Sequence, residues 1–190
     1  TVVTQMYQEA GVKIPTKIAG LLCSAIISDT LLFRSPTCTA ADEKIAENLA
    51  KIAGINLEEM AKAMFNAGSS MKGKSAEEIC FQDFKQFTVN NTVFGVGQIN
   101  SMSKDELAEI KEILEPHLEE VKEKNQLNMV YFMLTDILGE STELLCCGNH
   151  AKEYIISAFD LREDSDKIML EGVVSRKKQL IPTLVAALQH

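Results

Sequence analysis

The sequence predicts an α/β protein with helical segments first and then a compact α/β domain, in which helices flank a mixed sheet. Three observations support this fold class. Residues 1–66 carry helical periodicity, residues 88–174 alternate short β-rich runs with helical segments, and residues 67–75 concentrate Gly, Ser and Lys. Alternating strands and helices are typical of α/β domains, and small flexible residues are typical of linkers. We therefore place a domain boundary at residues 67–75.

Four helices are expected before this boundary. The first runs from Val2 to Gly11, because glycine commonly ends a helix. The second begins near Pro15, a residue that suits an early helical position, and carries a broad apolar face. Thr39 is expected to cap the third helix, which runs to about Ile52. The fourth covers residues 57–67.

After the boundary, turn and breaker residues define the elements. Asn90 and Asn91 lie between β-rich flanks and predict a hairpin over residues 88–99. A long amphipathic helix is expected over residues 104–124, and Pro116 should kink it. The remaining expected elements are strands over residues 129–137, 144–147 and 168–174, and helices over residues 151–159 and 178–189.

Composition narrows the function classes. The chain has 190 residues, 46% of them hydrophobic, and a formal net charge of −8. Such an acidic balance argues against a general nucleic-acid binder, and no apolar run approaches the roughly 20 residues that cross a bilayer. The five cysteines have no CxxC spacing, so we expect neither a disulfide framework nor a zinc cluster. A cytoplasmic protein without a membrane or nucleic-acid partner is expected.

Asp29 is the first candidate for chemistry. It ends the apolar helical segment AGLLCSAIISD, where a buried carboxylate would need a metal ion, a cation or hydrogen-bond donors. The alternative is a carboxylate that accepts hydrogen bonds from backbone N–H groups of the next loop, RSPTCT. The residues alone favour this alternative.

The second candidate is the run Arg176-Lys177-Lys178, at the junction of a predicted strand and the final helix. Residues 1–75 hold 8 Lys or Arg against 7 Asp or Glu, whereas residues 76–190 hold 11 against 20, so this cationic run stands in an acidic half. A strand-to-helix turn offers free N–H groups and the positive end of a helix dipole, and Arg can bind a phosphoryl group with two hydrogen bonds. A solvated turn is the alternative.

Lys85, in CFQDFKQF, is the third candidate, with a surface lysine as its alternative interpretation. The three histidines show no metal-ligand spacing, and the sequence contains no Walker or GxGxxG pattern. Composition and spacing alone thus predict an anion-binding α/β protein.

Two segments closely resemble family II inorganic pyrophosphatases of the DHH phosphoesterase superfamily. They are AGLLCSAIISDTLLFRSPTCT, residues 19–39, and GVVSRKKQLIP, residues 172–182. The likeness extends through NMVYFMLTDIL and covers essentially the whole chain. Because both segments occur in the family's order and at about its spacing, we regard the resemblance as specific.

The resemblance implies a domain organisation and a two-metal mechanism. In that family an N-terminal DHH domain binds two divalent cations, typically Mn²⁺ or Co²⁺, and Mg²⁺ is a further candidate. A smaller C-terminal domain closes over them and holds pyrophosphate. Residues 1–66 would then be the tail of the DHH domain, residues 67–75 the linker, and residues 76–190 the DHH-associated substrate-binding domain.

The resemblance also implies roles for single residues. Asp29 matches a metal ligand of the family, whereas Arg176, Lys177 and Lys85 match residues that contact substrate phosphates. Lys74 is the alternative match for the lysine near the linker. The implied activity is hydrolysis of pyrophosphate to two phosphates.

The family's other metal ligands have no counterpart in this sequence, so we expect an N-terminal DHH portion of the same polypeptide to supply them and the chain alone to be inactive. A second copy of the chain is a further candidate partner. Some members of the family carry regulatory CBS domains, and the sequence leaves that question open. Two alternatives remain: another DHH-type phosphoesterase, acting on polyphosphate or oligonucleotides, and a non-catalytic phosphate-binding or interaction module.

Overall fold

The computed structural model describes residues 1–69, 73–162 and 167–189. Its contacts divide the chain into two compact units, Thr1–Gly68 and Ser69–His190, and each is described by itself. Of the predicted linker, residues 67–69 belong to a helix and residues 70–72 lie outside the described part of the chain. Within the described ranges, no helix is long and apolar enough to cross a membrane.

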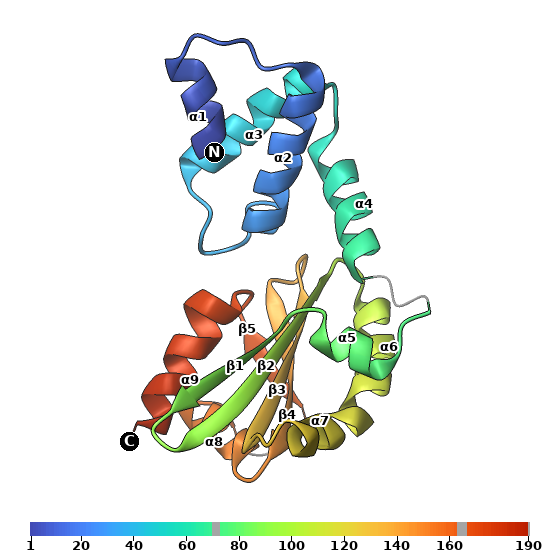
Figure 1. The fold of residues 1–190 in the computed structure, drawn as a ribbon, viewed down its shortest axis with the longest axis vertical. Helices are drawn as coiled ribbons and strands as arrows, with labels where there is room; N and C mark the ends of the chain where they lie inside the picture. Colours follow the sequence, from blue (N-terminus) through green and yellow to red (C-terminus); the bar gives the residue numbers. More distant parts are fainter. Residues whose placement is uncertain (70–72, 163–166, 190) are drawn as a thin grey trace. The chain divides into compact units, whose positions relative to one another are not determined.

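The first unit is helical, as predicted. Its core lies mainly between the second and third helices, on which Cys23, Ile27, Ala46 and Leu49 are fully buried. The four helices are α1 (Val2–Glu9), α2 (Thr16–Thr30), α3 (Ala40–Ala53) and α4 (Leu57–Ser69) (Figure 1).

The start of α3 confirms the predicted cap. The Thr39 hydroxyl accepts a hydrogen bond from the Asp42 N–H, and the Asp42 carboxylate accepts one from the Thr39 N–H. This reciprocal capping box satisfies two N–H groups that a helix start leaves without partners. The helix ends at Gly54, whose φ of 68° is a conformation that glycine adopts without steric cost.

The second unit is built on a five-stranded sheet in the order β1-β2-β3-β4-β5. β2 and β3 are parallel and the other neighbours are antiparallel, so the sheet is mixed, as predicted. Asn90, with φ of 53°, makes the predicted hairpin turn between β1 and β2. The strands are β1 (Phe84–Val89), β2 (Thr92–Ser101), β3 (Met129–Asp136), β4 (Ser141–Gly148) and β5 (Ile168–Glu171).

Helices cover both faces of this sheet (Figure 1). The predicted long helix is interrupted around Pro116, which cannot donate a backbone hydrogen bond. One face carries α5 (Ala76–Phe81), α6 (Lys104–Leu114), the 3₁₀ turn η1 (Glu115–His117) and α7 (Leu118–Lys124). The other face carries α8 (Ala151–Phe159), the π-helical turn η2 (Arg176–Leu180) and α9 (Ile181–Leu188).

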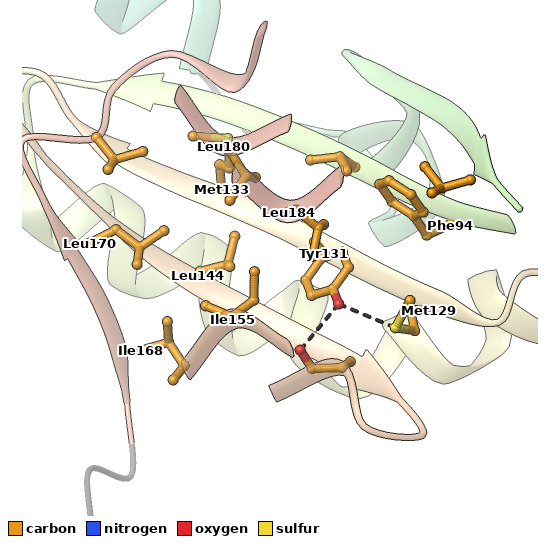
Figure 2. Close-up of a cluster of buried hydrophobic side chains, with 14 residues drawn as sticks. Phe94, Met129, Tyr131, Met133, Leu144, Ile155, Ile168, Leu170, Leu180 and Leu184 are labelled. Carbon is orange, nitrogen blue, oxygen red and sulfur yellow. Dashed lines mark hydrogen bonds between the residues drawn. The ribbon is translucent and has the colours of Figure 1, made fainter. Parts of the chain in front are cut away.

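Tyr131 brings a buried hydroxyl group into the core under α8 and α9 (Figure 2). Tyr131 is fully buried on β3, and its hydroxyl donates to the Ala151 carbonyl at 3.1 Å and contacts the Met129 sulfur at 3.2 Å. Because a buried hydroxyl without a partner is costly, this bond stabilises the packing of α8 on the sheet.

The structure corrects two predicted elements near the candidate site. The strand predicted to run to Val174 ends at Glu171, because Gly172 turns the chain with φ of 72°. The final helix begins at Ile181 instead of Lys178, and η2 precedes it. The prediction also missed α5 and residues 84–87 of β1.

Candidate functional site

The segment between β5 and η2 is held by side chains from β4 and β2. On β4, the Thr142 hydroxyl donates to the Val173 carbonyl at 2.6 Å and also contacts Thr135 of β3 at 3.0 Å. On β2, the Gln98 amide donates to the Val174 carbonyl at 3.1 Å. These bonds satisfy carbonyls of the short connection and fix its path.

Two side chains within SRKKQ fix the start of η2. The Ser175 hydroxyl accepts a hydrogen bond from the Lys178 N–H at 3.3 Å. The Gln179 carboxamide accepts from the N–H groups of Val174 and Ser175, both at 3.0 Å, and donates to the Gly172 carbonyl at 2.6 Å. The serine and glutamine of the motif thus shape the turn that presents its cationic residues.

Arg176 is buried, with 7% of its surface exposed. Its Nη1 donates to the backbone carbonyls of Asp83 and Val96, at 2.8 and 3.0 Å, and its Nη2 donates to Asp83 Oδ1 at 2.7 Å. A buried guanidinium needs such partners, since burying an unpaired charge is costly. The cation is therefore held at a defined place beside β1 and β2.

Lys85 lies on β1 directly opposite Val96, whose carbonyl accepts from Arg176. Strand alternation places Lys85 on the same face of the sheet as Phe87, which packs against the core under α8 and α9. Lys85, Lys177 and Lys178 are all exposed. The structure thus brings Lys85 and Arg176 to the same stretch of β2, and Lys177 follows Arg176 in η2.

Lys74, the alternative lysine, has a different setting. It lies just before α5, and its ammonium group donates to the Gln82 side chain at 2.7 Å. Unlike Lys85, it is not on the strand whose neighbour accepts from Arg176.

Asp29 lies in the first unit, in the last turn of α2, and is exposed. The expectation that it lies on the apolar face is wrong, because Ile26 and Ile27 face the core and the helical period turns Asp29 outward. Thr37 donates to the Asp29 backbone carbonyl at 3.3 Å, whereas the Asp29 carboxylate makes no hydrogen bond within the described ranges. The alternative of a loop-bonded carboxylate is therefore also wrong.

A cavity of about 430 Å³ adjoins Asp29, and Thr37 and Asp42 also line it. The exposed Asp29 carboxylate beside this cavity is suited to offer one oxygen ligand to a hard divalent cation. Asp42 is already engaged by the Thr39 cap and by the Thr1 hydroxyl. Among the described residues, no group of three or more His, Cys, Asp or Glu side chains lies close enough to hold a metal ion. Asp29 can thus be one ligand of a site but not the whole site.

The loop that follows Asp29 has an unusual backbone. Leu31, Leu32 and Phe33 all have positive φ, at 49°, 49° and 70°. Non-glycine residues in this region cost of order 1 kcal/mol each, so the surrounding packing must impose the conformation. Leu31 and Leu32 are buried, which is consistent with such packing.

The sequence did not indicate two residues of this region, Asp83 and Gln98. Asp83 precedes β1 and pairs with a residue 93 positions later, and Gln98 reaches Val174 from β2. No local pattern in the sequence connects such distant positions.

Known proteins are similar to this chain over most of its length. The family model described as the DHHA2 domain matches residues 62–187. A cobalt-dependent inorganic pyrophosphatase of Clostridium perfringens is 44% identical over 97% of this chain and 33% of its own length. A manganese-dependent inorganic pyrophosphatase of Bacillus subtilis is 38% identical over 99% of this chain and 60% of its own length.

A solved structure is similar as well. The crystal structure of a Methanococcus jannaschii protein assigned to the family II inorganic pyrophosphatases has a TM-score of 0.79 and 40% sequence identity. It matches 94% of this chain and 58% of its own chain. The chain therefore spans between one third and about 60% of the length of these relatives.

Proposed function

The chain belongs to the DHHA2 domain family, and on this premise we propose that it acts as the C-terminal part of an enzyme that hydrolyses inorganic pyrophosphate to two phosphates. We assign residues 1–66 to the tail of a DHH domain and residues 76–190 to the substrate-binding domain. The observation that carries the proposal is the buried guanidinium of Arg176, held beside Lys85 at a turn built by SRKKQ.

Arg176, Lys177 and Lys85 bind the substrate in this proposal. Pyrophosphate is a compact polyanion, and its hydrolysis requires that charge on the leaving phosphate be balanced. A positioned guanidinium can bind two phosphoryl oxygens, whereas each lysine acts as a mobile point charge. Because Arg176 is already held by backbone carbonyls, little side-chain freedom is lost when the anion binds.

Asp29 supplies one oxygen ligand to a divalent cation, Mn²⁺ or Co²⁺, and the other ligands come from an N-terminal portion of the polypeptide. Bound divalent cations would supply activation of water and neutralisation of phosphoryl oxygens. This assignment is supported by the exposed Asp29 carboxylate at the edge of a cavity and by the metals in the relatives' names.

The test compares the complete polypeptide, in which an N-terminal DHH portion precedes this chain, with the 190-residue chain alone. We expect the complete polypeptide to release phosphate from pyrophosphate with Mn²⁺ or Co²⁺, and the chain alone to show only background release with Mn²⁺, Co²⁺ or Mg²⁺. Metal-dependent turnover by the pure 190-residue chain would show that our account of the metal ligands is wrong. Preference for polyphosphate or an oligonucleotide would assign the protein to another phosphoesterase activity, and no turnover of any of these would indicate a non-catalytic module.

A further inference from the structure

The guanidinium of Arg176 is only partly used by the protein. Its five N–H groups comprise two on Nη1, two on Nη2 and one on Nε. Both Nη1 groups and one Nη2 group are engaged, by the carbonyls of Asp83 and Val96 and by Asp83 Oδ1. The Nε–H and the second Nη2–H have no hydrogen-bond partner among the residues that the structure describes. An Nε–Nη2 edge is one of the two edges with which arginine binds an anion through two hydrogen bonds.

The acceptors on the engaged edge differ in rigidity. The Val96 carbonyl belongs to β2, and the Asp83 carbonyl also accepts from the Gln98 N–H at 3.1 Å, so the sheet fixes both. The Asp83 carboxylate is a side chain, half exposed at 51%. Among the described residues, Asp83 Oδ1 is the acceptor that holds Nη2, and with the two carbonyls on Nη1 it sets the orientation of the guanidinium.

We propose that Asp83 is a positioning residue for the pyrophosphatase reaction. Its carboxylate holds Nη2 of Arg176, so that the Nε–H and the second Nη2–H are directed together at one phosphoryl group. This inference rests on the proposed function and adds a residue that does not itself touch the substrate. A carboxylate beside an anion site weakens the attraction for the anion, so its benefit must be geometric.

Two substitutions at position 83 distinguish the geometric role of the Asp83 carboxylate from the effect of its negative charge. Asp83→Asn keeps an oxygen acceptor for Nη2 and removes the negative charge, whereas Asp83→Ala removes both. In the complete polypeptide we expect Asp83→Ala to lower kcat/KM about ten- to a hundredfold and Asp83→Asn to recover it to within about fivefold of the wild type. Asp105→Ala is the matched control, because it removes an exposed carboxylate of the same unit with no bond to Arg176.

A double-substitution cycle tests whether Asp83 affects turnover through Arg176. Arg176→Lys keeps the charge but has no second edge to orient. If Asp83 acts through Arg176, adding Asp83→Ala to Arg176→Lys should lower kcat/KM by less than about twofold more. Additive losses would overturn the proposal, as would equal losses for Asp83→Asn and Asp83→Ala. Thermal unfolding of each variant checks that the fold is retained.

A second readout does not depend on activity. In the 190-residue chain, the proton–nitrogen NMR signal of Arg176 Nε should shift when inorganic pyrophosphate is added, and the shift should be at least halved in Asp83→Ala and largely restored in Asp83→Asn. An Nε signal that pyrophosphate leaves unchanged in the wild type would overturn the positioning proposal. If the complete wild-type polypeptide fails to hydrolyse pyrophosphate, the proposed function is wrong, and this binding readout still decides the role of Asp83.

Discussion

The ring of Phe132 lies over the backbone of Gly97, its partner across β2 and β3. A Cβ atom built on Gly97 would lie 2.4 Å from two carbons of that ring. Phe132 is fully buried, so the ring cannot move aside into solvent. Glycine at this position is therefore required by close packing in the centre of the sheet that carries the candidate site.

We expect Gly97→Ala to lower the free energy of unfolding by about 1–3 kcal/mol, because the added methyl group overpacks the core. Urea unfolding of the 190-residue chain is the measurement. Gly20→Ala is the control, since its Cβ would meet only Ala53 at 3.8 Å in the interior of α2. Gly20→Ala should leave the free energy of unfolding unchanged or raise it by up to about 1 kcal/mol. An unchanged urea midpoint for Gly97→Ala would contradict the packing argument.

The capping box of α3 should make the folding stability depend on pH. Hydrogen bonds from Thr1 and then Thr39 lower the pKa of Asp42. A lowered folded-state pKa stabilises the fold above the ordinary pKa of aspartate, and this contribution is lost as the pH falls through the folded-state value. Asp42→Asn should therefore lower the thermal midpoint at pH 7 but have a smaller effect near pH 3.

Glu47→Gln on α3, an exposed carboxylate outside the cap, is the control and should change the midpoint little at either pH. Thr39→Ala, which removes the other half of the capping box, should cost about 1 kcal/mol at pH 7. Equal effects of Asp42→Asn at both pH values would refute the pKa argument.

The cysteines should differ in reactivity. Burial raises the pKa of Cys80 to about 12, and burial together with the Glu119 hydrogen bond raises that of Cys147 to about 12. At pH 8 such thiols are ionised to only about one part in ten thousand, and the thiolate is the reactive form. Partial burial also raises the pKa of Cys38, but that thiol is partly exposed, unlike the buried Cys80, and the causes of its raised pKa do not include a carboxylate hydrogen bond like that of Cys147.

Iodoacetamide at pH 8, followed by mass spectrometry, should therefore modify Cys38 first. Cys38→Ser should remove this fast phase, and denaturation should expose the remaining thiols. Fast modification of Cys80 in the native chain would show that Cys80 is not buried.

Gln179 should matter for the turn it holds. Gln179→Ala leaves two N–H groups and the Gly172 carbonyl without this partner, so we expect a loss of about 1–3 kcal/mol in the free energy of unfolding. Gln179→Glu removes the donor and places a negative charge against the same carbonyl, so it should not restore stability. Gln86→Ala, at an exposed position of β1, serves as control. Urea unfolding measures all three.

The cationic residues should contribute unequally to turnover. In the complete polypeptide, Arg176→Ala and Lys177→Ala should each cost about 2–4 kcal/mol of transition-state stabilisation, roughly thirty- to a thousandfold in kcat/KM. Lys178→Ala should change it by less than about threefold, because an exposed charge outside the contacts is largely screened. Steady-state kinetics tests this, and equal small effects at all three positions would contradict the proposed substrate contacts.

Local sequence signals predicted most of the elements. Thr39 and Asp42 form a cap within four residues, Asn90 turns the hairpin, and Pro116 interrupts the long helix. Each signal acts through bonds or steric limits within one turn of chain, so it is readable without the fold. The end of β5 was predicted less well, because Val173 and Val174 suit a strand and only Gly172 marks the turn.

The sequence by itself determined the α/β class, the cationic turn at Arg176 and the family resemblance. It also indicated Lys85 as a candidate for substrate binding. Only the tertiary structure decided that Arg176 is buried and paired with Asp83, and that Asp29 is exposed. The physical reason is that the state of a charged side chain depends on which distant carbonyls and carboxylates the fold brings within hydrogen-bond distance. For Arg176 those partners lie 80 and 93 residues away, beyond the reach of any local pattern.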